Sequence, residues 1–170
     1  DWLTIPATQQ PAYIRFHATF FISDNKITRA WYFLDILEVI RQAGYNLFPF
    51  KGLQQPAPNP MIGDGIITYN VAESESLKSY NLTNAMIDGL LEFDGKSIDS
   101  MEQERFWDVK NMMWYGPGGI GTTRGLKGFQ DNHQIPFLKA FPDRGVFEED
   151  KTTNFVNIAE GNYTCHFGYP

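Results

Sequence analysis

The chain has 170 residues, 42% hydrophobic and 20% charged, which is the composition of a globular protein with enough chain for one domain and a sizeable core. Its net charge of −6, with no basic block, argues against a nucleic-acid partner bound through phosphates. One cysteine, Cys165, excludes an internal disulfide, and no apolar run reaches the roughly 20 residues that span a bilayer, so we expect a cytoplasmic protein without a membrane partner.

The N-terminal part of the chain predicts a hairpin followed by a helix. Residues 11–22 alternate between an apolar face and a mixed face, and a polar turn at 23–26 leads into a returning strand at 27–34. On that second strand Trp31 shares its face with Asp35, because side chains repeat every second residue. Asp35 opens a helix that ends at Gly44, and Glu38 three residues later completes a capping-box pattern.

Proline and glycine dominate residues 45–75, which predicts a linker and the one candidate boundary inside the chain. A helix capped by Asn81 or Thr83 is expected next, then a short polar helical turn at 97–105 and a strand at 106–115. An amphipathic helix, kinked or split by Pro136, follows the glycine-rich turn at 116–125. Two more strands are expected at 155–158 and 163–167. Hairpins with segregated helices indicate an α+β fold.

The glycine-rich turn allows two interpretations. Gly119-x-Gly121 with Gly125 is close to a phosphate-binding fingerprint, but that fingerprint needs a parallel β-α-β unit, which the α+β pattern does not offer. The alternative, which we favour, is a tight turn at the rim of a small-molecule pocket.

Two ionisable residues are candidates for proton transfer. Asp35 lies near an indole, where desolvation would suit it to general acid/base work, yet it is equally well explained as a helix cap. His133 lies on the apolar stripe of the helix after the glycine turn, where it is either a core histidine or a proton relay. The three histidines show no metal-ligand spacing, so we expect no metal site.

Two segments carry a resemblance to a known family. WYGPGGIGTTRGLKGFQDNHQIPFLKAFPDR, residues 114–144, resembles the first half of SnoaL-like polyketide cyclase and ester-cyclase domains. ISDNKITRAWYFLDILEVIRQAG, residues 22–44, resembles the closing segment of the same domains, with Trp31 and Asp35 in the family's Trp-x-x-x-Asp pattern and Asn25 in place of a glycine. The family's Gly-Thr-His-x-Gly stretch has no counterpart in this chain.

The two family-like segments occur in reversed order. We therefore expect a single domain over residues 1–170, assembled from 1–44 (the family's C-terminal half) and 76–170 (its N-terminal half), with 45–75 as the linker. Either the chain is a circular permutant, or it joins halves of two tandem domains that pair between chains in a domain-swapped homodimer.

The resemblance implies a cone-shaped barrel of the nuclear-transport-factor-two-like fold, in which a curved antiparallel sheet wraps over helices around a cavity. It also implies an aldol-type cyclase, isomerase or lyase that uses no cofactor or metal. The family's aspartate falls on Asp35 and its helix histidine on His133. The expected substrate-binding residues are His17, Trp31, Trp107, Trp114, Tyr115, Asn132 and His166.

Aromatic pocket walls favour an apolar substrate, and the resemblance implies that this substrate is a small carbonyl compound. The alternative function is a non-catalytic small-molecule-binding protein of the same fold, since one fold hosts many functions.

Overall fold

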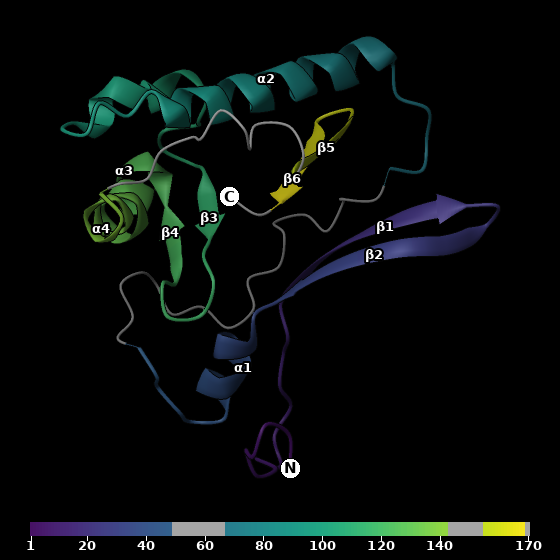
Figure 1. The fold of residues 1–170 in the computed structure, drawn as a ribbon, viewed down its shortest axis with the longest axis vertical. Helices are drawn as coiled ribbons and strands as arrows, with labels where there is room; N and C mark the ends of the chain where they lie inside the picture. Colours follow the sequence, from purple (N-terminus) through teal and green to yellow (C-terminus); the bar gives the residue numbers. More distant parts are fainter. Residues whose placement is uncertain (49–66, 143–154, 169–170) are drawn as a thin grey trace. The chain divides into compact units, whose positions relative to one another are not determined.

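The computed structural model describes residues 1–48, 67–142 and 155–168 (Figure 1). The chain divides into two compact units, Asp1–Pro58 with Met113–Thr123, and Asn59–Met112 with Arg124–Pro170, and each is described by itself. Both units contain helices and antiparallel hairpins or short strand pairs, so the predicted α+β class is confirmed.

The strands of the described residues form three separate two-stranded sheets, and no barrel closes among them. β1 (Phe16–Ser23) pairs with β2 (Lys26–Leu34), β3 (Met113–Tyr115) with β4 (Thr122–Arg124), and β5 (Phe155–Glu160) with β6 (Tyr163–Gly168). The single curved sheet expected from the family resemblance is therefore not observed. Each pair leaves two strand edges without a neighbouring strand in the described part of the chain.

The β1–β2 hairpin confirms the predicted N-terminal pair, with Phe16 opposite Leu34 and Ser23 opposite Lys26. Its first strand begins at Phe16 rather than at residue 11. The reason lies in Tyr13, whose backbone N–H and carbonyl both bind the side-chain amide of Gln42, each at 2.8 Å, instead of a strand partner.

The apolar face of this hairpin is more exposed to solvent than its mixed face, which is the reverse of the usual arrangement. Thr19 on the mixed face is only 7% exposed, whereas Phe16 and Tyr32 on the apolar face are 65% and 56% exposed. In most antiparallel sheets the apolar face packs on the core. Here the mixed face, which carries the predicted site residues, is the more buried one.

The helix α1 (Ile36–Gln42) begins after Asp35 as predicted. It ends at Ala43, and Gly44 adopts a φ of 92°, in the left-handed region that glycine occupies without strain. The predicted glycine stop is confirmed.

The long helix α2 (Glu73–Leu91) begins at Glu73, so the predicted caps at Asn81 and Thr83 are wrong, and so is the linker prediction for residues 73–75. Residues 45–48 and 67–72 of that linker form neither helix nor strand, and residues 49–66 lie outside the described residues. Glu73 and Glu75 in the first turn suit the positive end of the helix dipole. Thr83 bonds the hydroxyl of Thr164 in β6 at 3.0 Å instead of capping.

The β5–β6 hairpin, also predicted, packs along α2 (Figure 1). Its turn residue Gly161 is held from both sides. The carbonyl of Gly161 accepts a hydrogen bond from the Ser79 hydroxyl at 2.5 Å, and its N–H donates to the Ser76 hydroxyl at 2.9 Å. These two serine side chains of α2 therefore fix the hairpin turn on the helix.

The predicted strand at 106–115 is wrong except for its last three residues, which form β3. The carboxylate of Asp108 accepts the backbone N–H groups of Lys110 and Asn111, at 3.2 and 3.0 Å, and this local bonding turns the chain. The short helical turn predicted before it is confirmed as two 3₁₀ segments, Ile98–Met101 and Gln103–Arg105.

The helical run after the glycine-rich turn is split, as predicted from Pro136. It consists of α3 (Gly125–Phe129), a π-helical turn (Gln130–Gln134) and α4 (Ile135–Ala140). Proline has no N–H to give to the carbonyl four residues earlier, and its ring crowds that carbonyl. The wider π turn immediately before Pro136 relieves this conflict.

Buried apolar side chains concentrate in the second unit. Among the described residues, the large apolar side chains that are buried are Met101, Leu126, Phe129 and Phe167. In the first unit the buried side chains include the polar Thr19, Glu38, Thr122 and Thr123. None of the helices in the described ranges combines the length and apolar character needed to cross a bilayer.

Candidate functional site

Asp35 is the N-cap of α1. Its Oδ1 accepts the N–H of Glu38 at 3.1 Å, which satisfies one of the donors that a helix leaves open at its first turn. Only half of the predicted capping box forms. The Glu38 carboxylate binds Arg41, and the N–H of Asp35 donates to the carbonyl of Arg15 at 2.9 Å.

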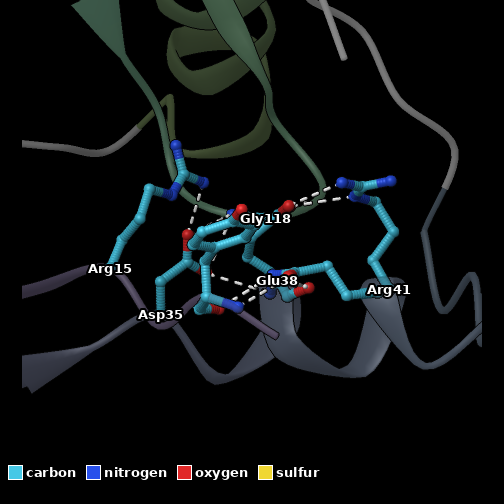
Figure 2. A network of polar contacts seen from close by, with 7 residues as sticks. Arg15, Asp35, Glu38, Arg41 and Gly118 are labelled. Atoms are coloured by element: carbon cyan, nitrogen blue, oxygen red, sulfur yellow. Dashed lines mark hydrogen bonds and ion pairs between the residues drawn. The ribbon is translucent and has the colours of Figure 1, made fainter. Parts of the chain in front are cut away.

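The glycine-rich turn meets the same carboxylate (Figure 2). The N–H of Gly118 donates to Asp35 Oδ1 at 3.0 Å and to Oδ2 at 3.1 Å. A side chain at this position would not fit, since a Cβ would lie 2.5 Å from the Glu38 nitrogen and 2.8 Å from the Leu37 carbonyl carbon. The turn therefore binds a carboxylate of the protein itself through the backbone N–H of Gly118.

Arg15 completes the cluster from β1's N-terminal flank. Its Nη2 lies 2.5 Å from Asp35 Oδ2, and the two side chains are 22% and 10% exposed. With the N–H groups of Glu38 and Gly118, the carboxylate takes part in four contacts, which is about its full acceptor capacity. Arg15 Nε is buried without a hydrogen-bond partner among the described residues.

A second ion pair lies beside the first (Figure 2). Arg41 donates to both oxygens of Glu38, at 2.9 and 2.6 Å, and Glu38 is only 3% exposed. The hydrogen bond to Glu38 raises the pKa of Arg41, so this guanidinium stays charged. The cavity between Arg41, Phe48 and Gly119 has a volume of about 10 Å³, which is enough for one water molecule and not for a substrate.

The hairpin carries the predicted residues His17 and Trp31. The ring of Trp31 meets Phe21 edge-on with centroids 4.9 Å apart, and the guanidinium of Arg29 lies 5.5 Å from both ring centroids. His17 Nε2 is 3.4 Å from the Thr19 hydroxyl. These side chains share the more buried face of the hairpin, as the sequence pattern indicates for Trp31.

Trp114 and Tyr115 lie in β3 of the first unit, where Trp114 is half-buried and Tyr115 is 39% exposed. The ring of Trp114 lies against Gly116, so the start of the glycine-rich turn is shaped by this indole.

The remaining predicted residues belong to the second unit. His133 lies in an aromatic row on the helical stripe, 5.4 Å from Phe129 and 5.7 Å from Phe137 between ring centroids. Trp107 lies 6.3 Å from Phe129. Asn132 donates to the carbonyl of Gly128 at 2.9 Å, within its own helical run.

His166 in β6 is bonded through Nδ1 to the Asn157 amide oxygen, and Asn157 in turn donates to Asn84 of α2 at 2.9 Å. Burial lowers the pKa of His166.

The first unit thus brings Asp35 together with Arg15, Glu38, Arg41 and Gly118. Sequence reasoning missed the last four as site residues. Arg15 was detectable, since it lies on the same strand face as His17 and carries the charge that a buried carboxylate needs. Gly118 was not, because nothing local relates it to a helix 83 residues earlier. Asp35 and His133 belong to different units, and their pairing stays a prediction.

No group of three or more His, Cys, Asp or Glu side chains in the described part of the chain is arranged to hold a metal ion. Comparison with protein-family models, with curated proteins and with solved structures finds no match.

Proposed function

We propose that the protein is a cofactor-independent cyclase, isomerase or lyase of SnoaL-like type. It acts on a small apolar carbonyl compound, with Asp35 as the general acid/base. The observation that carries the proposal is the contact between Asp35 and Gly118. The two segments that resemble opposite halves of one family domain meet at the residue that the resemblance assigns to catalysis.

The surroundings of Asp35 suit proton transfer at carbon. The carboxylate is 10% exposed and is held by Arg15 and by two backbone N–H groups, so its position is fixed before a substrate arrives. In the proposed step one oxygen exchanges the Gly118 N–H for the acidic C–H next to the substrate carbonyl. It takes that proton, leaves an enolate, and returns the proton to carbon or oxygen later. No electrons are gained or lost overall.

The other parts of the proposal extend beyond the first unit. His133 stabilises or relays the proton, and the aromatic residues Trp31, Trp107, Trp114 and Tyr115, with His17, Asn132 and His166, surround the substrate. Each of the three two-stranded sheets has edges without a neighbouring strand among the described residues. In the proposal, strand pairing at such edges completes a cone-shaped barrel, within one chain or in a domain-swapped homodimer. We place the protein in the cytoplasm, acting without cofactor, nucleic acid or membrane.

Deuterium exchange tests the proposed chemistry without knowledge of the natural substrate. A panel of cyclic and aromatic 1,3-dicarbonyl esters is incubated with the protein in D₂O, and exchange at the acidic carbon is followed by NMR. Asp35→Asn should lower catalysed exchange about 100-fold or more, because the amide cannot take the proton. Glu38→Gln is the matched control, since it removes the neighbouring buried carboxylate but not the proposed base. Equal exchange in Asp35→Asn and the wild type would remove Asp35 from the mechanism.

A second candidate function, a non-catalytic binding protein of the same fold, is favoured by one observation. All the acceptor capacity of Asp35 is used inside the protein. In that case no panel member exchanges faster than in buffer, and Asp35→Asn changes only stability. Saturable binding of a panel member without exchange would select this function over the first.

A further inference from the structure

The second unit contains an open groove of about 370 Å³, within the size range of small-molecule sites. It lies between the two 3₁₀ segments and the π-helical turn. The polar and charged residues of its wall are Asp99, Glu102, Gln103, Glu104, Arg105 and Gln130. The groove shares no residue with the Asp35 cluster, so ligand binding in it can be tested separately from proton transfer by Asp35.

Gln103 is the unusual residue of this wall. It is 3% exposed, its side-chain oxygen accepts a hydrogen bond from Gln130 Nε2 at 3.0 Å, and its own Nε2 is buried without a partner in the described residues. The bond from Gln130 fixes the amide orientation, so the unpaired group is a donor. A buried polar group without a hydrogen-bond partner is uncommon in native proteins, and a ligand that accepts from it is one explanation.

The backbone around Gln103 is irregular on both sides. Glu102 has φ 43° and ψ 41°, a left-handed conformation that costs energy for any residue other than glycine. Gln130 belongs to a π-helical turn, a local widening that is frequent at functional sites. The two irregular segments are joined through the Gln103–Gln130 bond.

The charge on the wall is predominantly negative. Three carboxylates, of Asp99, Glu102 and Glu104, face one cation, Arg105, which pairs with Glu102 at 2.5 Å. The carboxylates suit an ammonium group, and the buried N–H of Gln103 requires an oxygen acceptor.

We propose that this groove binds a small organic cation that also carries a hydrogen-bond-accepting oxygen, as in a monoacylated diamine. The oxygen accepts from Gln103 Nε2, and the ammonium group lies near Asp99 and Glu104. Both features are needed, because the groove is open and neither contact alone fixes a small ligand.

Three probes separate the two contacts. N-acetylputrescine carries the cation and the amide oxygen, butylamine only the cation, and N-butylacetamide only the oxygen. Each is titrated into the full chain while backbone amide shifts are followed by NMR. We expect saturable binding of N-acetylputrescine in the millimolar range, as its small size implies, with shifts confined to residues 98–105 and 130–134. Each truncated probe should bind at least about fivefold more weakly.

Two pairs of variants complete the test. Asp99→Asn should weaken N-acetylputrescine about two- to fivefold, the size expected of an exposed ion pair. Asp88→Asn makes the same charge change on α2 outside the groove and should have no effect. Gln103→Met should abolish the advantage of N-acetylputrescine over butylamine. Equal affinity for all three probes, equal effects of the two aspartate variants, or no saturable binding would each overturn the proposal, and none of these outcomes bears on exchange catalysed at Asp35.

Discussion

The carboxylate of Asp35 and the backbone N–H of Gly118 are 83 residues apart in sequence and bound to each other at 3.0 and 3.1 Å. This contact makes one cluster out of a helix start and a glycine-rich turn. It also explains why the turn needs glycine, since a Cβ at residue 118 would collide with the backbone of α1.

Gly118→Ala should destabilise the protein by about 2–3 kcal/mol, because the backbone atoms that it would contact cannot move aside cheaply. Gly44→Ala is the control. It has a positive φ of 92° but open space around it, so its cost should be about 1 kcal/mol from backbone strain alone. Urea unfolding of the two variants measures the difference. Equal losses would mean that the close approach at Gly118 is not tight.

The Arg15–Asp35 ion pair should be energetically significant, because its side chains are only 22% and 10% exposed. We expect a coupling of about 1–3 kcal/mol in a double-mutant cycle with Arg15→Met and Asp35→Asn. The exposed pair Lys78–Glu75, at 71% and 49% exposure, should couple by no more than about 0.5 kcal/mol and should weaken in salt. Similar couplings for both pairs would contradict the structural role of Arg15.

His166 should make the protein less stable in acid. Its folded pKa lies below the ordinary value of 6.5 because burial penalises the imidazolium. Above the unfolded pKa both states are neutral and the histidine costs nothing. As the pH falls through about 6.5 the unfolded state gains a proton first, and stability declines until the folded pKa is passed. Unfolding of wild type and His166→Asn between pH 8 and pH 5 checks this, and an unchanged slope in the variant would refute it.

The exposed apolar face of the β1–β2 hairpin predicts that a charge placed on it affects self-association of the protein more than its stability. Phe20 is 43% exposed and contacts Tyr32 edge-on at 5.6 Å. Phe20→Lys should cost only about 0.5–1 kcal/mol, the size of a cross-strand aromatic pair. If the proposed homodimer uses this face, the same change should shift the protein to monomer in sedimentation. Thr28→Lys on the same hairpin is the control, and a dimer that resists Phe20→Lys would exclude this face.

Local pattern was sufficient for several elements of the fold. The two hairpins, the Asp35 cap, the Gly44 stop and the break at Pro136 each depend on interactions between residues close in sequence, so they were predictable from it. The misplaced start of α2 and the lost strand at 106–112 had another cause. There, a side chain that resembles a cap or a strand residue makes a different interaction. Thr83 bonds the hydroxyl of Thr164 instead of capping a helix, and Asp108 accepts the N–H of Lys110 in a local turn instead of extending a strand.

By itself the sequence determined the α+β class, the position of Asp35 at a helix start and the presence of a tight glycine-rich turn at 116–125. Only the tertiary structure decided what these features do together. Gly118 meets Asp35, Arg15 balances its charge, and the mixed face of the hairpin is more buried than the apolar one. The physical reason is that periodicity and capping act within a few residues. A carboxylate's hydrogen-bond partners, by contrast, are set by which backbone comes within about 3 Å of it, and no local signal encodes that.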